Sequence, residues 1–467
     1  MVLCQIFIKR IDGMEYRDFI DEKQKIIESC GFDIEREDLN PLLYDFQKDI
    51  VRWALAKGKA AIFADCGLGK TPMQLEWANQ VCKHTGGSVL ILAPLAVAPQ
   101  TVTEGIKFGI DVTLCESQAD VMPGVNITNY EKLSKFEAHT FEGVVLDESS
   151  ILKSFTGKVR NEIITDFERV PYKLACTATP APNDFMELGN HSEFLGVMTR
   201  AEMLSMFFIH DSSSTSKWRL KGHAEDVFWQ WMCSWAVFID NPSNLGYEME
   251  GYDLPNLNIK EIIVDGDEFI NETLTLTQRR QARKDTLSER CSAAAELVNG
   301  SDEQWLVWCN LNDESSTLKG LISECSEVKG SDKATHKTEA MLSFSREKLK
   351  CLVTKPSIAG FGMNWQNCHN MIFVGLSDSY EQLYQALRRC YRFGQDKEVN
   401  AYIVMSAREG SVRANIERKE QDAQKMRDAM IELTKEITKK ELQKTARLST
   451  PYHAQEVMAL PRWEEFN

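Results

Sequence analysis

The sequence predicts an α/β fold with two parallel-sheet lobes, a helical insertion and a C-terminal helical tail. Apolar strand patterns alternate with helix patterns in two separate sets, as is typical of parallel sheets. A phosphate-binding loop lies in the first set at residues 64–71, and Arg389 and Arg392 lie in the second. Alone, this arginine pair would indicate only a solvated helix face. Together with the loop, it predicts two lobes that close on one nucleotide, because such arginines suit a phosphoryl group that gains charge.

Composition limits the class of protein. The chain has 467 residues, enough for two or three domains, with 43% hydrophobic and 26% charged residues, values ordinary for a soluble globular protein. No apolar run is long enough to cross a bilayer, and the first ten residues lack the basic segment of a secretory signal. The 13 cysteines include no C-x-x-C pair, which predicts reduced thiols in the cytoplasm and no zinc cluster. The net charge of -15 limits any nucleic-acid surface to a local groove.

The expected strands form two sets around a region of different composition. Residues from about 190 to 295 read as helical and aromatic, and their tryptophans favour a core over a base-stacking surface. After residue 411, apolar residues recur at three- and four-residue steps, which predicts a helix that braces the lobes rather than one that binds a partner or follows DNA. The expected strands are 60–64, 88–93, 143–147 and 172–176 in the first set, and 305–309, 350–354, 371–375 and 400–404 in the second. The clustered tryptophans are Trp218, Trp229, Trp231 and Trp235, and the tail stripe is Met426, Met430, Leu433 and Ile437.

The phosphate-binding loop reads A-D-C-G-L-G-K-T and departs from G-x-x-x-x-G-K-[ST] only by Ala64. Its glycines permit a tight backbone whose amides face phosphates, and the following helix, expected over 70–81, adds its positive dipole end. Lys70 is expected to reach the β- and γ-phosphates of ATP, and Thr71 to ligate Mg²⁺. The predicted ATP-binding residues of the loop are Gly67, Leu68, Gly69, Lys70 and Thr71.

An acidic pair, Asp147 and Glu148, ends an apolar strand 77 residues after Lys70 (147 − 70). The carboxyl ends of parallel strands line the crevice where ligands bind. One carboxylate there can hold the Mg²⁺ shell, and its neighbour can orient or deprotonate water. Such a pair is commonly structural, but the phosphate loop favours the catalytic interpretation.

Five segments, in the expected order, resemble the superfamily 2 helicases and, within them, the Swi/Snf-like ATPases. The resemblance covers residues 43–405 and implies two RecA-like lobes with P-loop NTPase architecture. Several details also resemble compact DEAD/DEAH-box-type helicases encoded by bacteriophages and prophages, which implies the cytoplasm of a bacterial host. The segments are L-Y-D-F-Q-K-D around Gln47, D-E-S-S-I-L-K-S-F-T-G-K at 147–158, T-A-T-P-A-P-N-D-F-M-E-L at 177–188, I-A-G-F-G-M-N-W at 358–365 and Q-A-L-R-R-C-Y-R-F-G-Q at 385–395.

The resemblance implies a role for each matching residue. Gln47 would recognise adenine, and Gln385 would lead the motif that contains the arginine fingers Arg389 and Arg392. Lys70 would hold the phosphates. Asp147 and Glu148 would serve the metal and the attacking water. Thr177 and Thr179 would couple the nucleotide state to lobe closure. The residues expected along the nucleic-acid track are Lys153, Thr354 and Asn364.

Four positions after the phosphate loop depart from the family pattern. Ser149-Ser150 follows the acids where the family has a histidine, so the route that couples hydrolysis to other motifs stays open. Ala178 replaces a glycine. Pro356 stands where the family often has a strand-contacting threonine, and proline has neither an N–H nor a hydroxyl.

The predicted function is an ATP-dependent DNA translocase or helicase, with double-stranded DNA the favoured track. Three alternatives remain. One is the motor subunit of a nuclease or restriction-type complex, with a nuclease or a replication or recombination protein as partner, and another is an RNA helicase. The third is a nucleotide-gated binding or scaffold protein that has lost turnover, against which the intact Lys70, Glu148, Arg389 and Arg392 speak. The predicted domains are an N-terminal helical extension (1–40), an ATP-binding lobe (41–190), a helical insertion (191–295), a second lobe (296–410) and a C-terminal helical tail (411–467).

Overall fold

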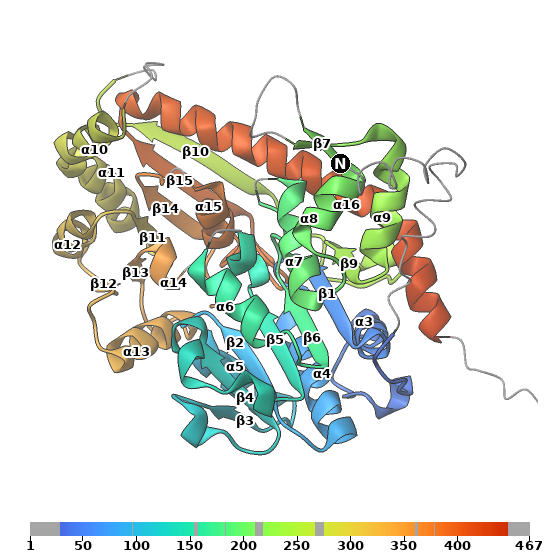
Figure 1. Cartoon of the computed structure of the whole chain (residues 1–467). Helices are drawn as coiled ribbons and strands as arrows, with labels where there is room; N and C mark the ends of the chain where they lie inside the picture. The colour runs from blue at the N-terminus through green and yellow to red at the C-terminus, as the bar shows by residue number, and fades with distance from the viewer. Residues whose placement is uncertain are drawn as a thin grey trace, which may run out of the picture.

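The computed structural model describes residues 29–95, 97–153, 157–182, 184–210, 218–266, 275–359, 363–377 and 379–446. Within them, two wholly parallel sheets lie side by side, each covered by helices (Figure 1). The predicted fold class is therefore confirmed. No helix of the described part is long and apolar enough to cross a membrane.

The first sheet has the strand order β3-β4-β2-β5-β6-β1-β9. Its central strands are apolar on both faces because helices cover both sides, and they separate two buried clusters. The strands are β1 (Lys59–Ala64), β2 (Val89–Ala93), β3 (Val112–Leu114), β4 (Val125–Asn129), β5 (Gly143–Asp147), β6 (Tyr172–Cys176) and β9 (Ala236–Ile239). The helices that matter below are α3 (Asp45–Lys57), α4 (Lys70–Thr85), α5 (Ala98–Lys107), α6 (Lys158–Asp166), α7 (Leu188–Leu195), α8 (Arg200–Phe207) and α9 (Glu225–Cys233).

The second sheet has the order β10-β15-β14-β11-β13-β12 and likewise separates two buried clusters. Its strands are β10 (Leu257–Ile263), β11 (Trp305–Cys309), β12 (Cys325–Glu327), β13 (Cys351–Thr354), β14 (Asn370–Val374) and β15 (Val399–Met405). Its helices are α10 (Leu276–Asp285), α11 (Leu287–Asn299), α12 (Asn312–Leu321), α13 (Ala334–Ser345), α14 (Pro356–Ala359) and α15 (Tyr380–Leu387). A short antiparallel pair, β7 (Phe208–His210) and β8 (Trp218–Leu220), lies apart from both sheets.

The stretch 191–295 is not a separate helical insertion. It contributes β9 to the edge of the first sheet, where Ala61 pairs with Ala236, and β10 to the edge of the second, where Leu257 pairs with Val399. The chain thus leaves one lobe and enters the other between these two strands. Its tryptophans are core, as predicted: Trp229, Trp231 and Trp235 are buried in the first lobe, with partly buried Trp218 packed against them. Of the predicted N-terminal extension, residues 1–28 lie outside the described residues.

Of the predicted tail, the described residues form one long helix, α16 (Gly410–Ala446), which runs from the second lobe across to the first (Figure 1). Residues 447–467 lie outside the described residues. Val412 and Ile416 are buried in the core of the second lobe. Met430 and Leu442 are buried in the two cores of the first lobe. The helix therefore connects both lobes through apolar packing. Its buried stripe includes Thr434 and Thr438, whereas Ile437, which the sequence placed in the stripe, is only partly buried.

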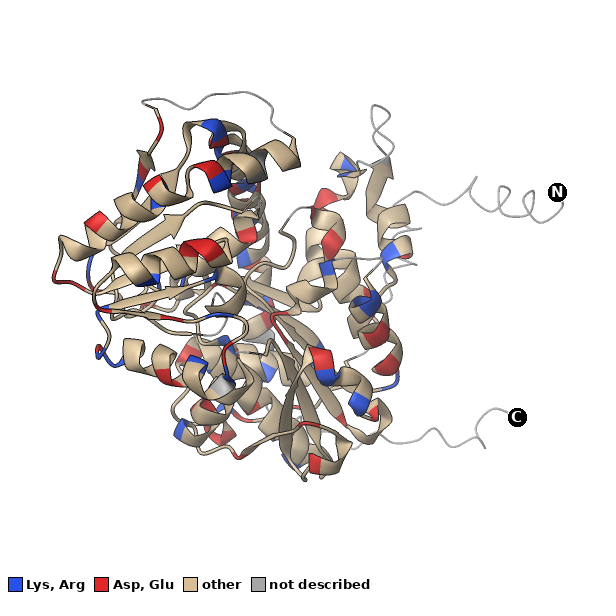
Figure 2. Ribbon diagram, turned by 90° about the vertical axis from the view of Figure 1, so that its left-hand side faces the viewer, with Lys and Arg blue, Asp and Glu red and all other residues tan. Residues whose placement is uncertain are grey.

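Charged residues of both signs are interspersed over the helices of the two lobes (Figure 2). In this view, neither sign of charge is confined to one lobe.

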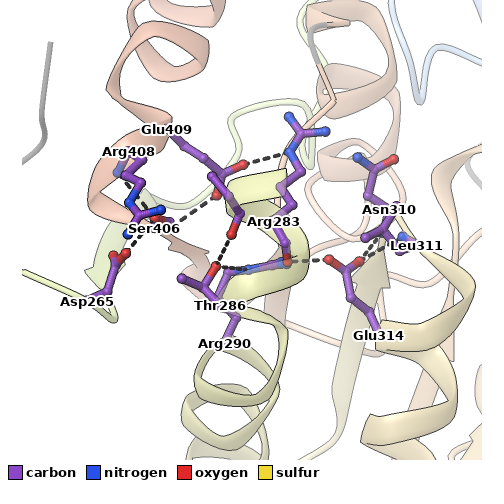
Figure 3. A network of polar contacts seen from close by, with 11 residues as sticks. Asp265, Arg283, Thr286, Arg290, Asn310, Leu311, Glu314, Ser406, Arg408 and Glu409 are labelled. Carbon is purple, nitrogen blue, oxygen red and sulfur yellow. Dashed lines mark hydrogen bonds and ion pairs between the residues drawn. The ribbon is translucent and has the colours of Figure 1, made fainter. Parts of the chain in front are cut away.

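A buried ionic network fixes the helices beside the second sheet (Figure 3). Arg290 donates to Glu314 at 2.6 Å, and both side chains are fully buried. The second oxygen of Glu314 accepts from two backbone N–H groups at the start of α12. Arg290 also donates to the carbonyl of Arg283, whose side chain pairs with Glu409 at 2.7 Å. Since all these groups are withdrawn from water, each charge depends on its partner.

We expect Glu314→Ala to destabilise the second lobe by about 3–5 kcal/mol, because it leaves the Arg290 guanidinium buried without its counter-ion. The measurement is the free energy of unfolding in urea, monitored by hydrogen exchange in peptides from β11 and β14. Asp422→Ala, which removes an exposed partner of Arg418, is the matched control and should change stability by less than about 0.5 kcal/mol. Equal effects of the two substitutions would contradict the assignment.

Candidate active site between the two sheets

A cavity of about 440 Å³ lies between the lobes. One wall comes from the loop after β1 and the residues after β5, and the opposite wall comes from the turn after α15. The cavity therefore collects residues that the sequence separates by more than 300 positions. From the first lobe they include Gln47, Gly67, Gly69, Lys70, Thr71, Asp147 and Glu148, and from the second they include Asn364, Arg389 and Arg392.

The loop after β1 depends on two glycines. Gly67 and Gly69 have φ values of 93° and 77°, in the left-handed region that favours glycine. A Cβ atom on Gly69 would lie 2.2 Å from Nε2 of Gln47, and one on Gly67 would lie 3.0 Å from the backbone nitrogen of Phe393. Helix α4 then begins at Lys70, so its free N–H groups open toward the cavity.

The Lys70 ammonium lies within this loop. Its Nζ donates to the carbonyls of Ala64 at 2.8 Å and Asp65 at 3.2 Å. Lys70 lines the cavity, and its stem is long enough to turn the ammonium toward a bound anion.

Gln47 is buried, and both ends of its amide contact the protein. Its Oε1 accepts from the backbone N–H of Tyr44, and its Nε2 donates to the carbonyl of Leu68, each at 3.0 Å. Gln47 therefore joins the start of α3 to the phosphate loop. Adenine recognition by this residue stays a prediction.

The acidic pair lies at the carboxyl end of β5. Oδ1 of Asp147 accepts from Gln74 on α4 at 2.8 Å. Glu148 has φ 54°, a left-handed conformation that is strained for a non-glycine residue and often marks a functional site. Burial raises the pKa of both carboxyls above their ordinary values, although Lys70 acts in the opposite direction. Thr177 donates to Oε2 of Glu148 at 3.4 Å, and its Oγ1 also accepts from the N–H of Thr179.

The second-lobe wall is strongly basic. Arg389 is anchored by donation to the carbonyls of Gln385 at 3.0 Å and Met363 at 3.1 Å. Burial and the neighbouring Arg389 lower the pKa of Arg392 to about 10, so Arg392 remains charged at neutral pH. Gln385 is 2% exposed, and neither atom of its amide has a partner within the described residues. This unsatisfied amide is costly unless a ligand or water completes it.

The residues predicted to follow a nucleic acid do not share one surface. Thr354 is fully buried and donates to the carbonyl of Val328, so the structure contradicts its assignment to an exposed track. Lys153 forms an ion pair with Glu381 on α15 and thereby connects the lobes. Asn364 lies at the nucleotide-sized cavity instead.

Sequence patterns did not single out two aromatic residues at the cavity. Tyr252 and Phe393 both line it, with ring centroids 4.5 Å apart. Phe393 follows Arg392 directly in the chain, and this neighbourhood is the feature of the sequence that could have placed it at the cavity. Tyr252 lies in the connection between β9 and β10, for which the sequence offered none.

His191 was also missed, because no chemistry was assigned to the histidines. It lies on α7, fully buried, with Nε2 3.1 Å from Oγ of Ser149 and its ring 5.1 Å from that of Phe63. A histidine from another element thus contacts the residue after the acidic pair. Burial lowers the pKa of His191 to about 4, so the ring is neutral.

Comparison with known proteins agrees with this geometry. Residues 289–394 match the family model described as the helicase conserved C-terminal domain, a segment that contains Gln385, Arg389 and Arg392. The helicase resemblance is confirmed over this segment. No curated protein matches the chain.

Among solved structures, the Sulfolobus solfataricus SWI2/SNF2 ATPase core in complex with dsDNA aligns with 89% of this chain and 99% of its own. The aligned residues are 16% identical, and the TM-score is 0.41.

Because His191 is buried and neutral, we expect the free energy of unfolding to fall in mild acid. Its pKa is about 4 in the folded protein and about 6.5 when unfolded. The unfolded state therefore binds a proton first, and the stabilisation present above pH 6.5 is lost as the pH falls toward 4. We expect His191→Asn to show a shallower fall in urea midpoint over this interval than the natural chain. His139→Asn, at an exposed position, should leave the slope unchanged, and parallel slopes for His191→Asn would contradict the prediction.

Proposed function

We propose that this chain is a Swi/Snf-like superfamily 2 ATPase that couples ATP hydrolysis to movement along double-stranded DNA. The observation that carries the proposal is the shared cavity, with the phosphate loop and Asp147-Glu148 on one lobe and Arg389 and Arg392 on the other. A site completed only when two lobes meet is suited to convert hydrolysis into relative motion.

The residues present fit ATP and Mg²⁺. Gly67 and Gly69 line the cavity beside the start of α4, where the first N–H groups of the helix have no helical partner and suit an anion. Arg389 and Arg392 line the same cavity and would neutralise further negative charge. The amide of Gln385 and Oγ1 of Thr179 are buried polar atoms without a partner in the described residues, and Gln385 leads the segment that also holds the cavity residues Arg389 and Arg392. Tyr252 and Phe393 line the same cavity as Gln47 and offer apolar surface for a base.

Each group has a distinct task in the proposed hydrolysis. Lys70 would leave the Ala64 carbonyl and hold the phosphates, and Glu148 would orient and deprotonate the attacking water. Thr71 and Asp147 would hold Mg²⁺, which neutralises phosphate charge when bound. Arg389 and Arg392 would stabilise the charge that develops on the transferred phosphoryl group, and this ties turnover to lobe closure.

Movement on DNA follows from this cycle if each lobe grips the phosphate backbone. Such contacts carry no base specificity and weaken with salt. The proposal is tested by ATPase assays with duplex DNA, single-stranded DNA and RNA in parallel, followed by triplex-displacement and strand-displacement assays. We expect the strongest stimulation by duplex DNA and displacement of a third strand. Stimulation by RNA alone would contradict the DNA assignment, and failure to hydrolyse ATP with any of these nucleic acids would contradict the ATPase.

We expect Lys70→Ala to reduce ATP turnover to the background of the assay, because the ammonium that holds the phosphates is lost. Lys83→Ala, at the exposed end of the same helix, is the control and should retain full turnover. Steady-state hydrolysis by a pure Lys70→Ala preparation would show that this lysine does not serve the phosphates.

Arg392→Ala should bind a fluorescent ATP analogue almost normally but lose kcat by about 10³-fold or more, as expected of an arginine that acts in the transition state. Arg346→Ala, at an exposed position after α13, should have no effect. A change confined to KM would instead make Arg392 a ground-state binding residue.

A further inference from the structure

One face of α15 points at the first lobe. Glu381, Tyr384 and Arg388 lie three and four positions apart, so they share a helical stripe. Each contacts the first lobe: Glu381 pairs with Lys153, Tyr384 donates to Asp65 at 2.5 Å, and Arg388 donates to Asp65 at 2.9 Å. None of these three residues lines the cavity, although Arg388 directly precedes Arg389, which does.

Asp65 is the centre of these contacts and belongs to the phosphate loop. One carboxylate oxygen accepts from the Tyr384 hydroxyl and from the backbone N–H of Cys66 at 2.7 Å, and the other accepts from Arg388. Burial alone would raise the pKa of Asp65, but the charges of Arg388 and Arg427 and the hydrogen bonds from Tyr384 and Cys66 together hold the pKa below its ordinary value. The carboxylate is therefore ionised and fully engaged across the lobe boundary.

Arg388 donates hydrogen bonds to the backbone of the phosphate loop as well as to the Asp65 carboxylate. Its Nη2 also donates to the carbonyl of Cys66 at 2.9 Å, one residue before Gly67. The turn after α15 presses on the same loop, since a Cβ atom on Gly67 would lie 3.0 Å from the nitrogen of Phe393. A shift of the loop must therefore move Arg388 and, with it, the adjoining turn that carries Arg389 and Arg392.

The long C-terminal helix joins this assembly. The guanidinium of Arg427, on α16, lies 4.7 Å from the ring centroid of Tyr384, a cation–π distance. Because α16 is anchored in the cores of both lobes, it holds Arg427 where the lobes meet.

We propose that Asp65 and Arg388 form an inter-lobe latch, which positions Arg389 and Arg392 against the phosphate loop before nucleotide binds. The proposal rests on the proposed ATPase function. Asp65 and Arg388 act here as positioning residues, because neither is required to touch the substrate.

The first test is a double-mutant cycle in the full chain with Asp65→Asn, Arg388→Gln and both together. Misplaced catalytic groups lower turnover steeply, so each single variant should lose kcat by about 10-fold with duplex DNA present. If the two residues act through each other, the double variant should lose little more than the worse single variant. Arg388→Lys, which keeps the charge, should retain more turnover than Arg388→Gln. Losses that multiply in the double variant would overturn the latch.

The second test does not need turnover. Hydrogen exchange of nucleotide-free protein should be faster in Arg388→Gln than in the natural chain, in peptides from residues 63–70 and 380–395. Arg418→Gln, at an exposed ion pair on α16, is the control and should leave these peptides unchanged. If Arg388→Gln exchanges no faster than the natural chain in these peptides, the latch is overturned, even where the natural chain hydrolyses ATP. If the natural chain hydrolyses no ATP but Arg388→Gln still loosens both peptides, the latch stands and the proposed ATPase fails.

Discussion

The arrangement of the molecule depends on close contact between the phosphate loop and the turn after α15. At Gly67 the two backbones approach so closely that a methyl group would crowd the Phe393 nitrogen, and the φ of 93° independently favours glycine. The cavity, the position of both arginines and the ion pair of Asp65 all follow from this contact. A change at Gly67 would therefore disturb the loop conformation and the lobe boundary together.

Much of the fold was predictable because buried parallel strands have strong local patterns. The expected strand 143–147 coincides with β5, and the helix expected from Lys70 begins there as α4. Continuous apolar runs bounded by glycine, proline or acids indicate such strands, and the phosphate loop marks the helix start by its glycines. The tail helix was predicted over nearly its full length for the same reason, since its apolar spacing is local.

Long-range pairings account for what could not be predicted. β9 is a four-residue apolar run directly after Trp235, and such a short run does not distinguish a strand from a buried helix. Its partner β1 lies about 175 positions earlier in the chain. Asp65 and Arg388 are 323 positions apart, and no spacing rule connects them. Thr354 was misassigned for a related reason, because a resemblance identifies a position but does not reveal whether the side chain is covered.

The anchoring of α16 also has a consequence for synthesis of the chain. Met430 and Leu442 complete apolar clusters in the first lobe, yet a ribosome makes them after the whole second lobe. Until then, the first lobe exposes the surface that these residues cover, against α9 and α3. Nascent chains should therefore acquire protease resistance in the first lobe late, in step with emergence of the last helix, and depend on chaperones during that interval.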